Sequence, residues 1–180
     1  MTLNRDTKTY FSFILGTEAA GGIIGWLTKD GVKIFQQLPQ SQLTPPPIVF
    51  PIAWTLLYGL MGYGAAKVYL SDCLSDFDSH NQNASEKQFD SHNQCTKNKR
   101  FALISFAVQL AFNLAWSIIF FNLRAFGLAF IWILLLWLLI CNMYRAFKRV
   151  DDKAAYLQLP YLAWTTFAAY LTYVAWLLNS

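Results

Sequence analysis

The sequence predicts an all-α integral membrane protein, built as a bundle of five transmembrane helices. Hydrophobic residues make up 56% of the 180 residues, and charged residues only 13%. The charges gather in short stretches, whereas a water-soluble domain spreads them over its surface. Between these stretches lie apolar runs of about 20 residues, the length of a helix that crosses a bilayer. The five runs cover residues 10–27, 48–70, 101–121, 126–147 and 154–178.

The first run, residues 10–27, follows Arg5 and Lys8, so a cleavable signal peptide is the competing interpretation. The run is too long for a secretory core and lacks a recognisable cleavage site, which favours a retained helix. Glu18 lies in its middle, and an ionisable group inside a membrane is costly. Glycines share the face of Glu18 and favour the close approach of another helix. They are Gly21, Gly22 and Gly25. A structural and a ligand-linked role for Glu18 both remain open.

The second run, residues 48–70, carries one stripe of residues about 60° wide at helical spacing. Its members are Trp54, Tyr58, Met61 and Ala65. The polar segment that follows, residues 71–100, contains FDSHNQ twice, at 77–82 and 89–94. Two copies are too few for a repeat architecture, so a duplicated and disordered loop insertion is predicted.

This polar segment holds both histidines of the chain. A metal site is the alternative to a solvated loop, although nothing in the sequence enforces its geometry. Its candidate ligands are His80, His92, Asp78 and Asp90. Cys73 and Cys95 flank the insertion and could pair if this loop lay outside the cytoplasm, whereas Cys141 is expected to pack as a small hydrophobic residue.

The third run, residues 101–121, has two different faces. Gln109, Asn113 and Trp116 fall within roughly 60° of one another on a helix. A stripe of alanines lies roughly 170° away, where small residues permit a helix pair or a subunit interface. These are Ala107, Ala111 and Ala115. From this run alone, the simpler interpretation is that the two amides form hydrogen bonds to neighbouring helices.

The last two runs complete the bundle. The fourth, residues 126–147, contains FIWILLLWLLI, which has no polar face and therefore argues against a soluble helical domain. The fifth, residues 154–178, presents one stripe at i, i+3, i+7 and i+11. The stripe consists of Tyr161, Trp164, Ala168 and Thr172. Three runs thus each place aromatic groups beside hydrogen-bonding groups, as expected around a large, planar, mostly apolar ligand.

Basic residues indicate the orientation in the membrane. Eleven of the 14 Lys and Arg residues would lie on one side of a five-span chain, and only Lys29, Lys33 and Arg124 on the other. Because cytoplasmic loops are enriched in basic residues, the N-terminus and the second and fourth loops are predicted to be cytoplasmic, with the C-terminus opposite. The net charge of +4 therefore reflects topology, and no nucleic-acid partner is expected.

Three segments resemble a known family. They are TPPPIVFPIAWTLLYGLMGYG at 44–64, QLAFNLAWSIIFFNLR at 109–124 and LPYLAWTTFAAYLTYVAW at 159–176. They look like signature segments of the TspO/MBR family, the tryptophan-rich sensory proteins and mitochondrial translocator proteins. The resemblance covers all five runs in order, apart from the insertion at 71–100.

The resemblance implies a five-helix bundle, commonly a homodimer, with a ligand cavity beneath the loop between the first two spans. It implies binding of protoporphyrin IX, haem or another tetrapyrrole, and of sterols or drug-like molecules in many members. No cofactor is required. With the stripes above, it gives candidate ligand-binding residues Trp54, Tyr58, Asn113, Trp116, Tyr161, Trp164 and Ala168. It also supports the third-run alanines Ala107, Ala111 and Ala115 as a dimer contact.

The chain departs from the family at two points. Leu43 and Ile48 stand where many members have tryptophans, which predicts a less aromatic lid and weaker stacking on a tetrapyrrole. The fifth run ends in LTYVAWLLNS and lacks the basic residue of the sterol-recognition pattern, so sterol binding gains little support.

The leading hypothesis is a membrane receptor for tetrapyrroles, whether porphyrin, haem or bilin, that acts in their transport or in stress regulation. An enzyme is the second class, because some bacterial relatives are reported to promote light-dependent porphyrin breakdown, in which Trp54, Trp116 or Trp164 would exchange electrons. A small transporter of lipophilic ligands is the third. Glu18 alone argues for its coupling to protons, and the five runs do not divide into equivalent halves.

Overall fold

The computed structural model describes residues 4–72 and 84–179, and the side chains of these residues apart from 84–90. The helices are α1 (Arg5–Phe35), α2 (Val49–Leu70), α3 (Ala84–Ser117), α4 (Phe126–Lys148), α5 (Asp152–Tyr156) and α6 (Leu159–Asn179), with a π-helical turn, η1 (Ile118–Asn122), directly after α3. Within the described ranges, five helical stretches are long and apolar enough to cross a bilayer.

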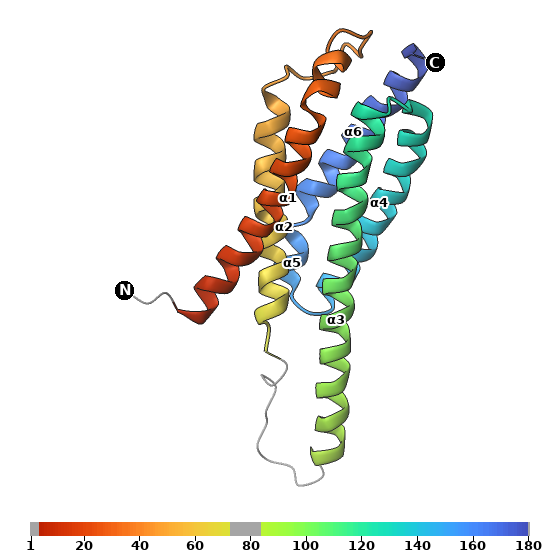
Figure 1. The fold of residues 1–180 in the computed structure, drawn as a ribbon. Helices are drawn as coiled ribbons and strands as arrows, with labels where there is room; N and C mark the ends of the chain where they lie inside the picture. The colour runs from red at the N-terminus through yellow and green to blue at the C-terminus, as the bar shows by residue number, and fades with distance from the viewer. Residues whose placement is uncertain (1–3, 73–83, 180) are drawn as a thin grey trace.

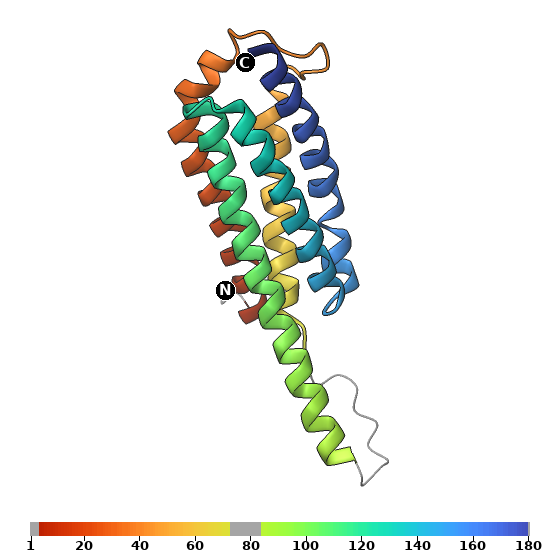
Figure 2. The same cartoon turned by 90° about the vertical axis from the view of Figure 1, so that its right-hand side faces the viewer.

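The long helices run alternately up and down, so that both ends of the bundle collect segments distant in sequence (Figure 1). Helix α1 packs along α2, α3 along α4, and α4 along α6. Figure 2 shows the lower part of α3 extending beyond the rest of the bundle. At the opposite end, the connection between α1 and α2 reaches α6, where the Asn179 amide donates a hydrogen bond of 3.1 Å to the Pro39 carbonyl oxygen.

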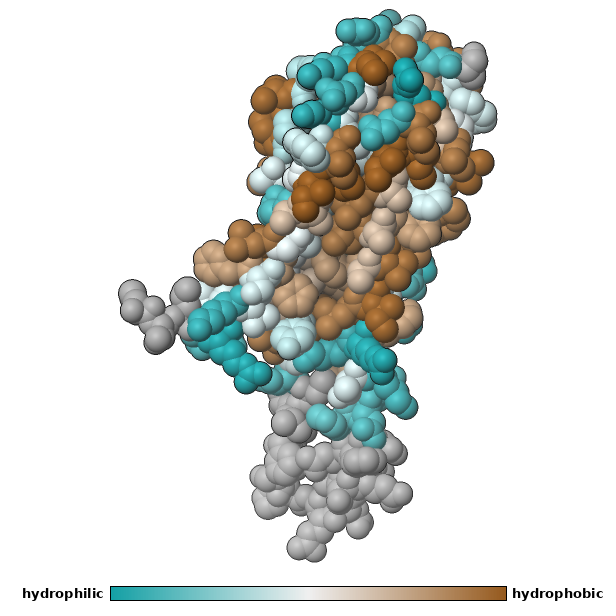
Figure 3. All heavy atoms as spheres, in the orientation of Figure 1, coloured by the Kyte–Doolittle hydropathy of each residue, from teal (hydrophilic) through white to brown (hydrophobic). Residues whose placement is uncertain are grey.

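An apolar belt surrounds the bundle. The face drawn in Figure 3 is hydrophobic along its middle and hydrophilic toward both ends. Large apolar side chains of α4 remain exposed on its outer face, including Leu134 and Leu138. An exposed surface of this kind is stable against lipid and unstable against water. The predicted all-α membrane bundle is therefore confirmed.

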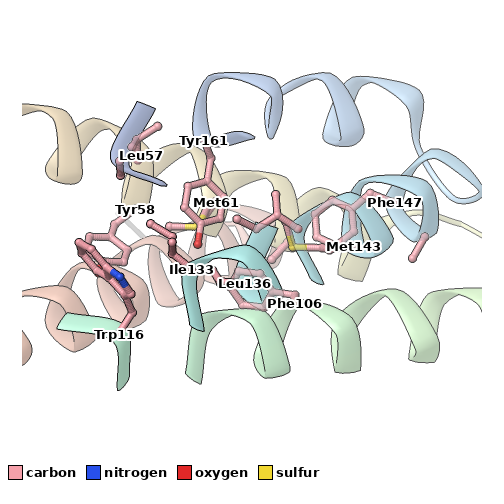
Figure 4. Close-up of a cluster of buried hydrophobic side chains, with 14 of the residues drawn as sticks. Leu57, Tyr58, Met61, Phe106, Trp116, Ile133, Leu136, Met143, Phe147 and Tyr161 are labelled. Carbon is pink, nitrogen blue, oxygen red and sulfur yellow. The ribbon is translucent and has the colours of Figure 1, made fainter. Parts of the chain in front are cut away.

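The interior is close-packed between α2, α3, α4 and α6 (Figure 4). Met61 and Ile140 are fully buried, and Tyr161 reaches into the cluster from α6. Helix α1 is tied to α2 at Thr17, whose hydroxyl donates a hydrogen bond of 2.9 Å to the Tyr58 carbonyl oxygen. Gly62 permits this approach, because a Cβ atom at that position would lie only 2.6 Å from the Thr17 hydroxyl oxygen.

Two helices are longer than the apolar runs that predict them. Helix α1 continues to Phe35, past Lys29 and Asp30, because its last turns pack against η1, where the rings of Phe35 and Phe120 lie 4.9 Å apart. Helix α3 begins at Ala84, inside the segment expected to be a disordered loop. The sequence from Ala84 to Ser117 contains neither glycine nor proline. The backbone hydrogen bonds of the apolar part therefore continue without interruption into the polar residues before it.

The fifth span is interrupted where the sequence predicts one continuous helix. Helix α5 ends at Tyr156, and α6 begins at Leu159. Pro160 explains the break, because its nitrogen carries no hydrogen to donate to the carbonyl group four residues earlier. The break places the buried Gln158 side chain against Gly64 of α2.

Several predictions for the polar segment fall on residues that the structure does not describe. Asp78, His80 and Cys73 lie outside the described residues, as does the Asp90 side chain, whereas His92 is exposed on α3. The suggested metal site therefore stays a prediction. Cys95 takes part in a disulfide bond, and Cys141 of α4 is a free thiol.

Candidate ligand cavity

A cavity of about 870 Å³ lies between α1, α2, η1 and α6, beneath the connection of residues 36–48. Its volume falls in the range typical of sites for drug-sized ligands. Helix α1 contributes a face formed by Glu18, Gly21, Gly25, Thr28, Val32 and Phe35. The residues follow one another at three- and four-residue spacing, so they lie on one side of the helix.

Tryptophans from three spans form part of the cavity wall. Trp54 of α2, Trp116 of α3 and Trp164 of α6 all line the cavity. The rings of Trp54 and Trp164 meet nearly at right angles, with centroids 6.5 Å apart. Trp116 instead stacks on Phe120 of η1, with centroids 5.1 Å apart and planes 23° from parallel. These flat, apolar surfaces suit a ligand with an extended ring system.

The π-helical turn η1 shapes the same wall. Phe120 and Phe121 are consecutive residues that both line the cavity, and their rings lie 4.9 Å apart at 84°. A π-turn holds an extra residue within one turn and thereby changes the direction in which following side chains point. Gly31 of α1 lies against this turn, since a Cβ atom there would be 2.7 Å from the Phe121 carbonyl carbon.

Tyr58 separates the cavity from a buried polar group. Its ring lines the cavity and stacks on Trp54, with centroids 5.5 Å apart. Its hydroxyl points away and donates a hydrogen bond of 2.8 Å to Asn113 Oδ1. The Tyr161 hydroxyl lies close to the Asn113 amide without meeting hydrogen-bond geometry. Asn113 and Tyr161 are fully buried, and neither lines the cavity.

The structure thus places the seven predicted ligand-binding residues in two groups. Five line one cavity: Trp54, Tyr58, Trp116, Trp164 and Ala168. The other two, Asn113 and Tyr161, lie behind Tyr58. Gln109 is also buried and directs its amide nitrogen to the Met61 sulfur at 3.7 Å. Both third-run amides therefore bond to α2, as the simpler interpretation of that run predicts.

Of the three glycines of α1 expected to allow close approach of another helix, only Gly21 is in close contact with one. The Tyr58 ring occupies the place of a side chain at Gly21, whereas a Cβ atom added at Gly22 or Gly25 would have no neighbouring atom within 4 Å. All three glycines line the cavity. Gly22 and Gly25 keep this part of the cavity open, because a larger side chain at either position would project into the cavity.

The connection of residues 36–48 supplies polar groups that the periodicity of the spans does not reveal. Gln36, Gln40, Ser41 and Thr44 line the cavity at this end. Gln40 is fixed by donating a hydrogen bond of 2.9 Å to the Phe35 carbonyl oxygen. Leu43 and Ile48, the two departures from the family, are exposed and lie outside the lining. The one sequence feature that bears on the path of this connection is the run Pro45, Pro46 and Pro47, which predicts an extended chain leading into α2.

The alanine face of α3 points away from the cavity. Ala107 and Ala111 are exposed, and Ala115 is partly exposed. Trp116, one residue after Ala115, is buried on the inner face. The two faces of this helix thus separate an outward stripe of small residues from an inward stripe that contacts α2 and the cavity.

Comparison with known proteins identifies the family to which this sequence is similar. The family described as "TspO/MBR family" matches residues 13–177. The chain is 32% identical to the tryptophan-rich protein TspO of Chlorobaculum tepidum, with 98% of this chain and 99% of that protein covered. It is 29% identical to the tryptophan-rich sensory protein of Cereibacter sphaeroides, covering 98% and 95%. It is 31% identical to the translocator protein of Ovis aries, covering 87% and 82%.

Proposed function

The chain belongs to the TspO/MBR family, and we propose that it is a membrane receptor that binds a tetrapyrrole in the cavity between its helices. The ligand would be a porphyrin such as protoporphyrin IX, haem or a bilin, or a related lipophilic molecule. The single observation that carries the proposal is the convergence of Trp54, Trp116 and Trp164, from three different spans, on one cavity.

The chemistry of the walls supports a ring-shaped ligand. Removing several hundred Å² of apolar ligand surface from water contributes several kcal/mol at about 25 cal/mol per Å², before the cost of ordering both partners. The polar groups lie mainly at the end formed by residues 36–44, where Gln36 and Ser41 can act as donors. Propionate groups of a porphyrin would lie at this end, with the ring between the tryptophans.

Two further features belong to the proposal. The protein forms a homodimer through the outward face of α3, with Ala107, Ala111 and Ala115 at the contact. It lies in the membrane with its N-terminus and the basic loops in the cytoplasm, because the basic residues of these segments gather at one end of the bundle. In this arrangement the cavity and the polar connection above it lie toward the opposite side. Binding would serve tetrapyrrole transport or a response to stress.

Titration of protoporphyrin IX into purified protein in lipid nanodiscs tests the proposal, with quenching of tryptophan fluorescence as the signal. Trp164→Ala is expected to weaken binding about tenfold or more, because it removes a central aromatic contact. Trp26→Ala is the matched control, since Trp26 is exposed on α1 and does not line the cavity. Equal affinity of the wild type and Trp164→Ala would refute the assignment of the cavity.

A further inference from the structure

Glu18 is the one formally charged side chain among the described residues that line the cavity. It lies at the end of the α1 face remote from the connection of residues 36–48. Phe35 marks the other end, 17 residues later in the same helix. At a rise of 1.5 Å per residue, these two positions are about 25 Å apart along the axis. The Glu18 side chain is partly exposed, and it lies near the middle of α1, well away from the polar end of the cavity.

No basic side chain neutralises this carboxylate among the described residues. The cavity lining contains no lysine, arginine or histidine in that part of the chain. The ion pairs of Lys33 with Asp30 and of Lys67 with Asp151 do not involve Glu18. A carboxylate in an apolar site without a cationic partner is costly, and a cation brought in by a ligand offsets that cost through a charge-assisted hydrogen bond.

The surroundings of Glu18 favour a cation that carries an apolar body. Its Oε1 atom lies against α2, 3.4 Å from where a Cβ atom of Gly59 would be. Tyr58, the residue before Gly59, presents its ring to the cavity, and Trp54 stacks on that ring. Aromatic faces attract ammonium groups, indole most strongly. A single acid at the inner end of an aromatic cavity is thus suited to an amine with a large ring system.

We propose that Glu18 makes the cavity selective for lipophilic ligands that carry a protonated amine, with the ammonium group bonded to the Glu18 carboxylate and the apolar body between the aromatic walls. This inference rests on the proposed function, since it specifies the chemistry of ligands taken by the same cavity. It assigns different ends of the cavity to different substituents. Cationic groups bind at Glu18, and anionic groups bind near Gln36 and Ser41.

Two porphyrins that differ by one amine test the inference. Both probes carry the protoporphyrin ring, with one of its two propionates converted to a methyl ester. The second propionate is converted to a propyl amide in the neutral probe and to a 2-aminoethyl amide in the amine probe. In nanodiscs of uncharged phosphatidylcholine, the wild type is expected to bind the amine about tenfold more tightly than its neutral counterpart. Glu18→Gln is expected to remove this preference, so that it binds the two probes with equal affinity.

Two further variants control for fold and for charge. Glu18→Asp retains the carboxylate and is expected to retain a preference for the amine. It keeps the inference testable if Glu18→Gln fails to fold. Asp30→Asn removes an exposed carboxylate of the same helix outside the cavity and is expected to leave the preference unchanged. Equal binding of both probes by the wild type, or a preference that survives in Glu18→Gln, would overturn the inference and leave the proposed function standing. Failure of both probes and of protoporphyrin IX to bind would overturn the two together.

Discussion

The Tyr58 hydroxyl on α2 donates a hydrogen bond of 2.8 Å to Asn113 Oδ1 on α3, and both side chains are buried. This bond links the inner face of α3 to the residue whose ring lines the cavity. Tyr58→Phe keeps the ring and leaves Asn113 Oδ1 buried without its donor. A buried acceptor left unpaired costs about 1–3 kcal/mol, so the melting temperature in detergent is expected to fall.

Tyr63→Phe provides the control for this change. Tyr63 lies on the same helix, but it is exposed and stacks on Tyr10. Its variant is expected to melt at the temperature of the wild type, as followed by circular dichroism. Identical melting of both variants would show that the bond between Tyr58 and Asn113 contributes nothing to stability.

Gly21→Ala tests the packing of Tyr58 against α1. A methyl group at Gly21 would coincide with the Tyr58 ring, so the ring must move or the helices must separate. The expected loss is about 1–3 kcal/mol, in spite of the better helix propensity of alanine. Porphyrin affinity should fall as well, because the displaced ring forms part of the cavity wall.

Gly16→Ala is the matched control on the same helix. Gly16 has no neighbouring atom within 4 Å of the added methyl position and does not line the cavity. Its melting temperature should equal or exceed that of the wild type, and its porphyrin affinity should not change. A Gly21→Ala protein as stable as Gly16→Ala would contradict the packing described for Tyr58.

Ala111→Phe tests the proposed dimer. A phenylalanine on the outward face of α3 prevents the close approach that small residues permit between helices. The variant is expected to be monomeric where the wild type is dimeric, as measured by light scattering of the purified protein in detergent. Leu138→Phe, an exposed position on α4, should leave the dimer intact. A monomeric wild type, or a dimeric Ala111→Phe protein, would exclude this interface.

Labelling of single cysteines tests the proposed orientation. In a protein whose native cysteines are replaced by serine, Lys29→Cys and Lys153→Cys place one thiol at each end of the bundle, at exposed positions. A membrane-impermeant maleimide added to intact bacterial cells is expected to label the first variant. The second should react only after the cells are permeabilised, because its loop is cytoplasmic.

The reverse labelling pattern would contradict the charge bias. It would agree instead with the disulfide bond of Cys95, since disulfides persist in oxidising compartments. Cys95 and Lys153 lie on the same side of the membrane in a five-span chain. The labelling of Lys153→Cys therefore decides between the orientation indicated by the basic residues and the one indicated by the disulfide bond.

The sequence by itself determined the five spans and the faces of each helix. Apolar runs of bilayer length predict helices without reference to neighbours, and a turn of about 100° per residue decides which side chains share a face. For this reason the stripe of Gln109, Asn113 and Trp116 proved to be inward, and the alanines outward. The extended α3 and the break before α6 escaped prediction, because hydropathy does not report backbone hydrogen bonds.

Only the tertiary structure decided which faces meet and what lies between them. Tyr58 and Asn113 belong to stripes that looked equally suited to a ligand, yet one lines the cavity and the other is buried behind it. Glu18 and the connection of residues 36–44 enter the cavity wall through the packing of α1 against α2 and η1. Periodicity fixes directions around one helix axis, whereas a cavity depends on the distances and rotations between helices, which arise from contacts far apart in the chain.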